Sequence, residues 1–593
     1  MNRIKPHEAV LYDTTFRKGA SKMNDINALY DLWLNKAEDD EELVSELKAI
    51  EGKEDEILDR FYKNLEFGTA GLRGVIGAGT NRMNIYTVNQ ATQGLADYLN
   101  SEFDTPSVAI AYDSRIKSDV FAKSAAGVLA ANGIKVWFYP RLVPTPMLSF
   151  AVRRLKCQSG IIITASHNPS KYNGYKCYDP NGYQMTDEAA AKTYDFIEKV
   201  DMFDGVKKVS FDSALADGKI EYIGEDIFEE FYEKVLSASV YDCHGTDLKV
   251  IYTPLNGTGN LPVREILSRK GIDSVRVVKE QELPDGSFPT CPFPNPEIKQ
   301  AFELAIKMGE NEQADLLLAT DPDCDRVGIA VNVDGEYKLM TGNEVGVLLC
   351  EYLLSRRKEL GTLPKDPIVV KSFVTTSLVD EVAKTYSAET RSLLTGFKYI
   401  GELITQLEEK GEENRFVVGM EESYGYLSGT HARDKDAVVA SMLICEMAAY
   451  YKSKGISLYD KMQSLYKQYG MYLNTLLNFG FEGATGMKKM QDMMEALRAD
   501  APKEIAGLKV EEISDYMASK TIYVSDGTEK VINLPKSNVL AYKLPGGSGV
   551  IVRPSGTEPK IKIYITANSD TRENALKLSD KLGEDMKKIM NID

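Results

Sequence analysis

We expect an α/β protein in which three similar α/β domains with mixed sheets precede a smaller C-terminal α+β domain. Three observations predict this fold. The 593 residues suffice for about four domains of ordinary size. Short β-branched runs alternate with helical patterns along most of the chain. From about Gly470 onward that alternation gives way to a different order of elements.

The chain begins with an expected helical extension over residues 1–60. Leu29, Trp33 and Leu34 fall on one face of a helix. The acidic run 38–42 predicts a solvated turn or the start of another helix.

Three strand–loop–helix units follow. Apolar runs at 108–112, 250–252 and 368–370 each end in a polar loop that leads into a helical pattern. This order is typical of α/β units whose loops lie at the carboxyl ends of the strands. The units are too different in sequence to count as a repeat. The expected domains cover residues 61–210, 211–340 and 341–468.

The C-terminal part predicts a separate domain over residues 469–593. Helical segments rich in Met and Lys are expected to precede short strands at 550–552 and 562–566, and a final helix closes the chain. Strands that pair in sequence order beside such helices indicate an α+β domain.

The composition limits the partners. A formal net charge of −17 disfavours nucleic acid and anionic membranes. The chain has no apolar run of eighteen residues and no apolar stretch after its N-terminus, so we expect a cytoplasmic protein without a membrane span. The seven widely spaced cysteines predict reduced, buried thiols. The oligomeric state does not follow from the sequence.

The first loop whose residues could take part in a reaction is Thr164-Ala165-Ser166-His167-Asn168-Pro169, directly after the apolar run 160–163. A serine at this place lies where ligands bind in α/β sheets. The loop lacks the glycines of the G-x-S-x-G hydrolase motif. The alternative is a polar turn with Asn168-Pro169 at its corner. Lys176 follows ten residues later and adds a cation that could face the same place.

The second loop holds Asp321, Asp323 and Asp325 between two apolar runs. Three carboxylates at alternate positions can converge on one hard cation, and without a cation their repulsion costs energy. An EF-hand needs Gly and Glu at its sixth and twelfth positions, where this chain has Arg326 and Asn332. The sequence therefore favours a metal site that is not a calcium-sensing loop.

Further loops carry polar or cationic groups. The third motif is the segment 419–425, which presents Glu421 and Ser423. These side chains suit hydrogen bonds to sugar hydroxyls, and Lys398 precedes the segment. The alternative for the lysines and arginines is solvated surface. The loop 67–74 contains Arg73 and is either a mobile linker or an anion-contacting loop.

The fourth motif is Arg553-Pro554-Ser555-Gly556-Thr557-Glu558-Pro559-Lys560, in which an arginine, two hydroxyls and a glycine can form a phosphate cradle. Neither a Walker sequence nor G-x-G-x-x-G occurs in the chain, so a nucleotide is not the expected phosphate donor.

In this order, the four motifs resemble the α-D-phosphohexomutase superfamily, which includes phosphoglucomutases and phosphomannomutases. The resemblance extends from about Gly68 to Lys560. It implies three similar α/β domains and a smaller fourth domain around a central cleft, with one loop from each domain.

The resemblance also implies roles for individual residues. Ser166 would be the phosphoserine. Asp321, Asp323 and Asp325 would hold one Mg²⁺ per chain together with the phosphate on Ser166. The other expected site residues are Arg73, His167, Lys398, Glu421, Ser423, Arg553, Ser555, Gly556 and Thr557 for substrate binding, Arg326 for charge stabilisation, and Lys176 for proton transfer. That last role would require neighbouring cations to lower the pKa of Lys176.

The substrate class follows from the same resemblance. The segment 421–425 is more similar to the glucose-type loop than to the Gly-Glu-Met-Ser-Gly-His loop of mannose-type members, although Met420 stands where glycine is usual. We expect interconversion of glucose 1-phosphate and glucose 6-phosphate, with glucose 1,6-bisphosphate as intermediate and activator. A phosphopentomutase, a glucose 1,6-bisphosphate synthase, a phosphatase and a non-catalytic sugar-phosphate sensor are the alternatives.

Overall fold

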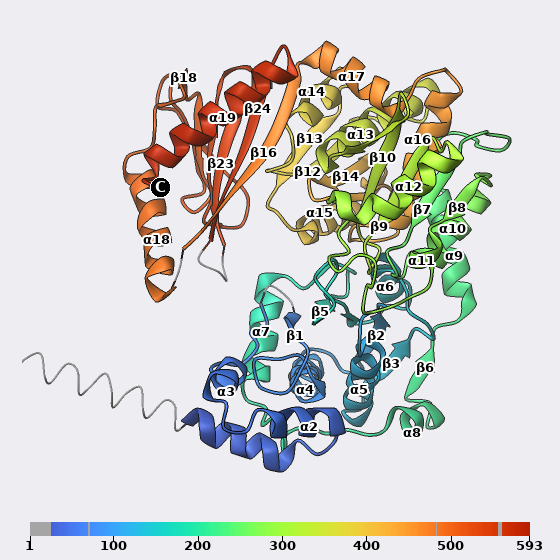
Figure 1. The fold of residues 1–593 in the computed structure, drawn as a ribbon, viewed down its shortest axis with the longest axis vertical. Helices are drawn as coiled ribbons and strands as arrows, with labels where there is room; N and C mark the ends of the chain where they lie inside the picture. The colour runs from blue at the N-terminus through green and yellow to red at the C-terminus, as the bar shows by residue number, and fades with distance from the viewer. Residues whose placement is uncertain (1–24, 69–70, 482, 556–559, 593) are drawn as a thin grey trace, which may run out of the picture.

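The computed structural model describes residues 25–68, 71–481, 483–555 and 560–592. Four domains follow one another along an arc, from the N-terminal helices to the C-terminal sheet (Figure 1). The predicted α/β class and the division into three α/β domains and one C-terminal α+β domain are confirmed. No described helix is long and apolar enough to cross a membrane.

Three helices precede the first sheet. A helix over residues 25–36 is followed by α2 (Glu41–Ala49) and α3 (Glu54–Phe61). Asp40, from the acidic run, caps α2 by accepting hydrogen bonds from the backbone N–H groups of Glu42 and Leu43. The apolar faces meet in a cluster around Trp33, which is 1% exposed. This cluster also includes Ala78 and Tyr86, so the helical extension packs directly against the first domain.

The first domain contains a six-stranded mixed sheet in the order β1-β5-β4-β2-β3-β6. β2, β3, β4 and β6 run parallel, whereas β5 pairs antiparallel with β4 and β1. Its strands are β1 (Gly71–Val75), β2 (Ser107–Tyr112), β3 (Lys135–Phe138), β4 (Ser159–Ile163), β5 (Tyr172–Tyr178) and β6 (Ile220–Tyr222). Its helices are α4 (Ile85–Glu102), α5 (Ser118–Ala131), α6 (Thr145–Arg154), α7 (Asp187–Ile197) and α8 (Phe211–Ala216).

The second domain has a five-stranded mixed sheet in the order β11-β10-β9-β7-β8. The strands are β7 (Val250–Thr253), β8 (Val275–Val277), β9 (Leu316–Thr320), β10 (Val327–Val333) and β11 (Glu336–Met340). The helices are α9 (Glu225–Leu236), α10 (Asn260–Arg269), α11 (Lys279–Glu282), the 3₁₀ helix η1 (Lys299–Phe302) and α12 (Glu303–Glu312). β9 and β10 are antiparallel neighbours joined by the loop 321–326, which carries the three aspartates.

The third domain has a four-stranded sheet in the order β13-β12-β14-β15. The strands are β12 (Ile368–Ser372), β13 (Glu389–Leu393), β14 (Phe416–Glu421) and β15 (Gly425–Leu427). The helices are α13 (Gly342–Glu359), α14 (Leu378–Thr385), α15 (Phe397–Glu409), η2 (Glu413–Arg415), α16 (Ala437–Lys452) and α17 (Leu458–Tyr469).

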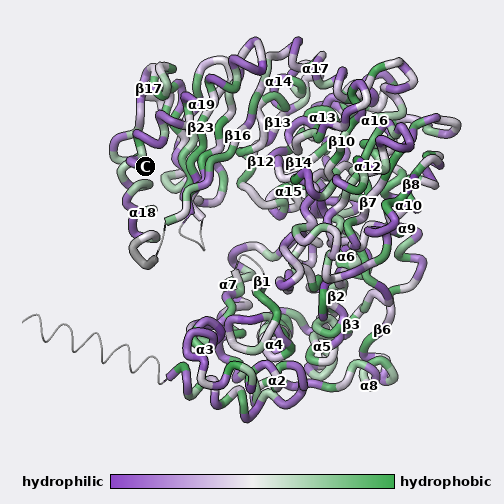
Figure 2. Tube along the Cα trace, in the orientation of Figure 1, coloured by the Kyte–Doolittle hydropathy of each residue, from purple (hydrophilic) through white to green (hydrophobic). Residues whose placement is uncertain are grey.

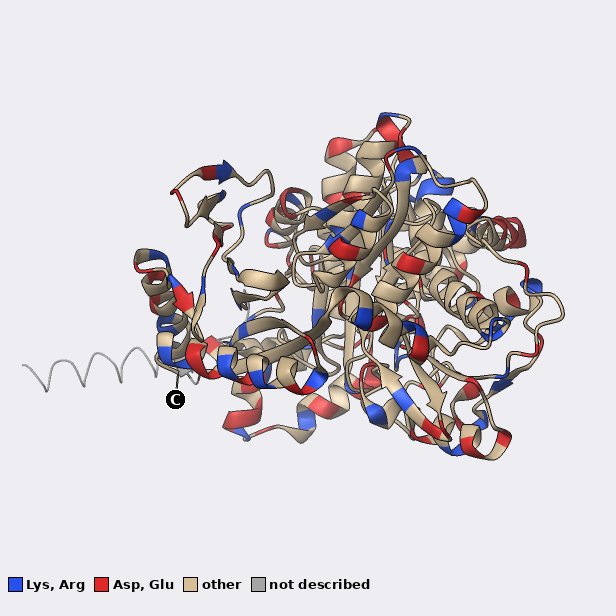
Figure 3. Ribbon diagram, turned by 90° about the horizontal axis from the view of Figure 1, so that it is seen from above, with Lys and Arg blue, Asp and Glu red and all other residues tan. Residues whose placement is uncertain are grey.

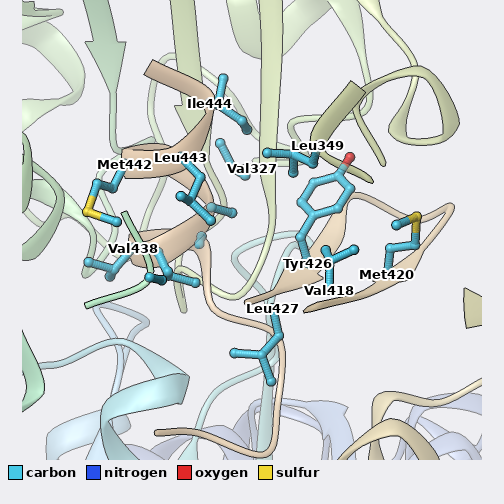
Figure 4. Close-up of a cluster of buried hydrophobic side chains, with 14 of the residues drawn as sticks. Val327, Leu349, Val418, Met420, Tyr426, Leu427, Val438, Met442, Leu443 and Ile444 are labelled. Atoms are coloured by element: carbon cyan, nitrogen blue, oxygen red, sulfur yellow. The ribbon is translucent and has the colours of Figure 1, made fainter. Parts of the chain in front are cut away.

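Helix α16 is the central helix of the hydrophobic core, and all of its residues before Lys452 are buried. Helix α16 contacts β15 and the second-domain elements α10, β9 and β10. Its residues Val438, Met442 and Leu443 belong to the buried cluster drawn in Figure 4. The unusual Met420 is a buried strand residue of β14. Its sulfur packs against Gly346 of α13. A Cβ at position 346 would lie only 2.8 Å from this sulfur, so the glycine leaves room for the methionine.

The fourth domain has a seven-stranded antiparallel sheet in the order β16-β24-β23-β22-β19-β20-β21 and a small two-stranded sheet. The strands are β16 (Met471–Gly480), β17 (Glu504–Ile505), β18 (Leu508–Lys509), β19 (Glu512–Asp515), β20 (Lys520–Tyr523), β21 (Glu529–Val531), β22 (Leu540–Lys543), β23 (Gly549–Pro554) and β24 (Lys560–Ser569). The helices are α18 (Gly483–Ala499), η3 (Pro545–Gly547) and α19 (Arg572–Ile589).

As expected, a helix rich in Met and Lys (α18) precedes β23 and β24, and α19 closes the chain, but strand β16, which was not expected, comes before α18. All ten residues of β16 pair with β24, which lies about 90 positions later in the chain. Long-range pairing of this kind decides strand structure and leaves only a weak local pattern.

Hydrophobic stretches follow the strands as well as buried helices such as α16 (Figure 2), while acidic and basic residues are interspersed along the outer helices (Figure 3). All seven cysteines are buried and free, as predicted.

Candidate active site

The loops after β4 and β14 meet at the aspartate loop, residues 321–326, which follows β9. Backbone hydrogen bonds join it to the first and third domains. Thr145 N donates to Asp323 O (2.9 Å), Val327 N to Tyr424 O (3.1 Å) and Ala437 N to Cys324 O (3.3 Å). Carboxyl ends of strands from three domains therefore form one site.

Ser166 is buried and close to the first aspartate. Its Oγ donates a 2.8 Å hydrogen bond to Asp321 Oδ2 and lies 3.2 Å from His167 Nδ1. Its backbone has φ of 51°, in the left-handed region, and its N–H donates to Thr164 Oγ1 at 2.8 Å. Burial lowers the pKa of His167 to about 3, with the positive charge of Arg326 as a further cause. His167 is therefore neutral and can accept or donate one hydrogen bond at physiological pH.

Asp321, Asp323 and Asp325 are all buried, and one oxygen from each lies within 4.8 Å of the others. In the described part of the chain, this is the one cluster of at least three possible ligands of that size. The Oδ1 atoms of Asp323 and Asp325 are buried and accept no hydrogen bond from any described residue. Three buried carboxylates, two of which have an oxygen without a hydrogen-bond partner among the described residues, fit Mg²⁺.

The aspartates differ in their electrostatic environment. Burial and the charges of Asp323 and Asp325 raise the pKa of Asp321 well above its ordinary value. Burial acts in the same direction on Asp323, but Lys176, a hydrogen bond with Asp321 and the charge of Lys435 together outweigh it and lower the pKa of Asp323. The backbone N–H groups of Asp325 and Arg326 donate to Asp321 Oδ1 (3.1 and 3.0 Å).

Two lysines neutralise part of this charge. Lys176 Nζ, from β5, lies 2.9 Å from Asp323 Oδ2 and 3.8 Å from Asp325 Oδ2. Lys435 Nζ lies 3.2 Å from Asp325 Oδ2 and 3.0 Å from Asp434 Oδ1. The direct partners of Lys176 are thus carboxylates, whereas its proposed role as a proton carrier called for neighbouring cations.

Arg326 points from the aspartate loop toward Glu297, with Nη1 2.8 Å from Glu297 Oε1. Its Nε is buried and has no hydrogen-bond partner among the described residues. Arg73 lies on β1 opposite Gly174 of β5, and its charge interacts with those of Asp323 and Asp325.

The third-domain residues face the same region. Glu421, at the end of β14, accepts a 2.7 Å hydrogen bond from Gly396 N, and Ser423 lies in the turn that follows. The neighbouring Glu422 accepts hydrogen bonds from Ser372 Oγ (2.9 Å) and Thr375 Oγ1 (3.3 Å). These bonds fix the backbone of the turn that carries Ser423.

The remaining predicted residues lie farther along the arc. Lys398 opens α15 and is bound to Asp187 Oδ1 of α7 at 2.6 Å, so it joins the first and third domains. Arg553 lies at the end of β23, and its charge interacts with Tyr564 and with Tyr399 of the third domain. Ser555 directly follows β23. Gly556 and Thr557 lie outside the described residues.

Two residues of the site were not predicted from the sequence. One is Lys435, and the other is Thr145, whose Oγ1 donates to Asp323 Oδ2 at 3.1 Å. Pairing of Lys435 with an aspartate more than a hundred residues away leaves no local signal. Thr145, which opens α6 after a proline, could have been noticed as a helix-start hydroxyl.

Known proteins match this chain over most of its length. Residues 64–203, 229–335 and 341–469 match the models of phosphoglucomutase/phosphomannomutase alpha/beta/alpha domains I, II and III, and residues 493–579 match the C-terminal domain of that family.

Among individual relatives, a phosphoglucomutase of Staphylococcus saprophyticus is 35% identical over 536 residues, covering 90% of this chain and 96% of the relative. A phosphoglucomutase of Staphylococcus haemolyticus is 36% identical over 517 residues, with 86% and 92% covered.

Two solved structures share the fold. One is a phosphoglucomutase/phosphomannomutase family protein from Burkholderia thailandensis, with a TM-score of 0.63, 19% identity and coverage of 88% of this chain and 97% of that one. The other is the open form of the phosphoglucomutase parafusin from Paramecium, with a TM-score of 0.64, 16% identity and coverage of 89% and 96%.

Proposed function

Because the chain belongs to the phosphoglucomutase/phosphomannomutase family, whose members are phosphotransferring isomerases, we propose that it interconverts glucose 1-phosphate and glucose 6-phosphate through a phosphoserine at Ser166. One observation carries the proposal. A buried serine hydroxyl lies 2.8 Å from a carboxylate oxygen of the three-aspartate cluster. A sensor or a purely structural metal loop would have no use for a nucleophile at that place.

The aspartates would hold one Mg²⁺ through Asp321, Asp323 and Asp325. When bound, the ion supplies positive charge that offsets the negative charge of a phosphoryl group on Ser166. Asp321 already accepts the hydrogen bond of the Ser166 hydroxyl, so the same carboxylate orients Oγ in the unphosphorylated enzyme. Arg326 has a buried Nε without a partner among the described residues, and this N–H is available to a phosphoryl oxygen.

The proposed reaction has two halves. In the first, the free hydroxyl of the sugar phosphate attacks phosphorus, the bond from phosphorus to Ser166 Oγ breaks, and the hydroxyl proton finally resides on Oγ. Lys176 is the proposed carrier of that proton. The resulting glucose 1,6-bisphosphate turns end for end. In the second half Ser166 Oγ attacks the other phosphate and the bond between that phosphorus and its sugar oxygen breaks. The sugar oxygen then receives the serine proton and becomes a hydroxyl.

Recognition of the sugar is assigned to the third domain and recognition of the non-reacting phosphate to the fourth. Glu421 and Ser423 are proposed to bind sugar hydroxyls, since a buried carboxylate is a strong hydrogen-bond acceptor. Arg553, Ser555, Gly556 and Thr557 are proposed to bind the distal phosphate, with help from Lys398, and Arg73 and His167 to contact the transferring group.

Two relatives named phosphoglucomutase support the hexose as substrate, because each covers more than four fifths of this chain. A ribose phosphate is the alternative that the same chemistry would accept. The hexose proposal predicts faster turnover of glucose 1-phosphate than of ribose 1-phosphate or mannose 1-phosphate.

A coupled assay tests the proposal. Purified enzyme receives glucose 1-phosphate, Mg²⁺ and a trace of glucose 1,6-bisphosphate, and glucose 6-phosphate is measured with its dehydrogenase. We expect turnover that falls by at least about 1000-fold in Ser166→Ala, because the nucleophile is lost. Ser101→Ala is the matched control, since Ser101 is an exposed serine of α4 that bonds only to Tyr98 O.

Other outcomes of this assay would change the proposed reaction or its substrate. Full activity of Ser166→Ala with bisphosphate present would contradict the phosphoserine relay. Brisk ribose turnover without glucose turnover would keep the mechanism and change the substrate. Release of free phosphate at a rate comparable to isomerisation would indicate a phosphatase, and net accumulation of bisphosphate a synthase.

A further inference from the structure

The backbone of residues 164–169, here called the serine loop, is held in an unfavourable conformation at Ser166. The φ of Ser166 is 51°, a region that residues with a side chain seldom occupy and that costs on the order of 1 kcal/mol or more. Such a conformation persists only where the surroundings hold it. The hydrogen bond from Ser166 N to Thr164 Oγ1 fixes one side of the loop, but the carbonyl groups of the loop need donors as well.

A single buried side chain supplies those donors. Arg115, from the loop after β2, donates from Nη2 to the carbonyl oxygens of Ser166 and Asn168. From Nη1 it donates to Pro169 O (3.1 Å) and Tyr172 O (3.0 Å). The planar guanidinium thus binds four carbonyl groups that surround the nucleophile, and a lysine ammonium lacks the fork geometry for this.

The guanidinium is itself held from two sides. Its Nε lies 3.4 Å from Asp113 Oδ2, and both side chains are completely buried. Asp113 Oδ1 in turn accepts hydrogen bonds from Arg115 N (2.9 Å) and Ser118 Oγ (2.7 Å). On the other side, the ring of Phe288 lies with its centroid 5.1 Å from Arg115 Cζ, within the range of a cation–π contact.

Phe288 belongs to the second domain, in the turn 285–288. This turn lies directly against the backbone of the Arg115 loop. A Cβ on Gly286 would come within 2.4 Å of Ile116 N and 2.7 Å of Ser114 O, so only glycine permits the approach. The contact therefore requires a defined position of the second domain relative to the first.

The turn is also connected to the aspartate loop. Asp285 N donates to Asn256 O (3.2 Å), and two residues farther along, Thr258 N donates to Pro322 O (2.8 Å). The segment 256–258 thus contacts both the turn beneath Arg115 and the loop that carries Asp321. One continuous set of contacts in the second domain therefore fixes the position of the serine loop relative to the aspartate loop.

We propose that Arg115 is a positioning residue for the reaction: its guanidinium, held by Phe288 of the second domain, orients Ser166 toward the aspartate loop. Arg115 does not touch the substrate in this role. The inference rests on the proposed relay at Ser166, and it assigns to the turn 285–288 the function of transmitting the position of the second domain to the nucleophile.

Arg115→Lys and Phe288→Leu test the proposal, with Arg356→Lys as the matched control. Arg356 also stacks on an aromatic ring, 4.6 Å from the centroid of Tyr450, and donates to a carbonyl oxygen of another domain, Val240 O, at 3.4 Å. It differs from Arg115 in making no contact with the serine loop. Each variant is checked for folding by circular dichroism and thermal unfolding.

The readout is the single-turnover rate at which radiolabelled glucose 1,6-bisphosphate phosphorylates Ser166, measured beside kcat and KM for glucose 1-phosphate. We expect Arg115→Lys to slow labelling and kcat by about 100-fold with KM changed by less than about threefold, since a misplaced nucleophile affects the transition state more than binding. Phe288→Leu should slow both by about tenfold. Arg356→Lys should label at the wild-type rate even where its melting temperature falls.

A folded Arg115→Lys that labels at the wild-type rate would overturn the proposal. Should that variant fail to fold, Phe288→Leu decides, because it removes only the aromatic ring and retains the guanidinium of Arg115 and its four carbonyl acceptors. Wild-type labelling kinetics in folded Phe288→Leu would then overturn the proposal. A wild-type enzyme that takes up no label at Ser166 at all would instead overturn the relay itself, and the two failures are thereby distinguished.

Discussion

At the scale of single residues, the environment of Glu421 determines when this acid carries its charge. Burial raises the pKa of Glu421 to about 6, and the negative charge of Glu422 acts in the same direction. The positive charge of Lys435 and the hydrogen bond from Gly396 N act against burial without cancelling it. The carboxylate is therefore ionised at neutral pH and becomes protonated just below it.

This titration predicts a pH-dependent substrate affinity. The ionised carboxylate accepts hydrogen bonds from sugar hydroxyls more strongly than the protonated acid, so kcat/KM should fall as the pH decreases through about 6. Glu421→Gln is neutral at every pH. We expect the ratio of kcat/KM between wild type and Glu421→Gln to be about tenfold at pH 8 and to decrease toward one below pH 5.

Using a ratio removes the titration of the substrate phosphate, which affects both proteins alike. Steady-state rates with glucose 1-phosphate between pH 5 and 8 supply the measurement. A ratio that stays constant over this range would show that Glu421 does not bind the sugar in its ionised form.

The sequence predicted proximity only for site residues that are close to one another along the chain. Asp321, Asp323 and Asp325 were predicted as one cluster because their spacing alone forces their proximity, and the cluster is present. The partners of Lys398 and Lys435 depend on contacts between domains. Lys398, expected to bind substrate, is bound to Asp187, which lies 211 positions away. No local pattern contains that information.

At the scale of secondary-structure elements, the N-terminal helices form a unit attached to the first domain. Trp33 is 1% exposed and packs edge-on against Phe61, Tyr86 and Phe203, with ring centroids 5.5 to 5.8 Å apart. Tyr86 belongs to α4 of the first domain, so the tryptophan joins the extension to that domain.

Trp33→Ala should detach this unit without affecting catalysis. Removing a fully buried indole typically costs about 3–5 kcal/mol, which exceeds what a small helical cluster contributes. We expect an earlier thermal transition by circular dichroism and greater protease sensitivity of residues 25–61, with kcat unchanged. Leu32→Ala is the control on the same helix, since Leu32 is 42% exposed and should leave both properties as they are. Loss of kcat in Trp33→Ala would show that the helices act on the site.

The elements predicted well are those with a strong local signal. The apolar runs at 108–112, 250–252 and 368–370 are β2, β7 and β12, each followed by a helix. β16 was missed because its burial alternates weakly and its ten residues gain their pairing only from β24. The short strands β19 to β21 were missed for the same reason, since they pair with one another and with β22 at the edge of the sheet.

At the scale of the whole molecule, the first three domains and the fourth are joined differently. One hydrophobic core includes buried residues from all of the first three domains and extends to Met471, Tyr472 and Ala575 of the fourth, which also has a core of its own. A small cluster around Phe373 of the third domain and Val539 of the fourth connects the two parts, with the rings of Phe373 and Tyr516 5.1 Å apart. The aspartate loop thus lies within the continuous part of the molecule.

This placement predicts the effect of removing the metal. The aspartate loop keeps its backbone bonds to Thr145, Tyr424 and Ala437 without an ion, and Lys176 and Lys435 offset part of its charge. An ion present at ten times its Kd stabilises the fold by only about 1.4 kcal/mol. Spread over several hundred cooperatively unfolding residues, that free energy raises the melting temperature by about 2 °C or less.

We therefore expect EDTA to abolish turnover of glucose 1-phosphate while the melting temperature changes by no more than about 2 °C. Added Mg²⁺ should restore the activity completely, because the loop does not unfold in the absence of the ion. Differential scanning calorimetry and the coupled assay on the same samples make the comparison. A fall of about 10 °C with slow or incomplete recovery would mean that the ion, and not the contacts between the three domains, holds the aspartate loop in place.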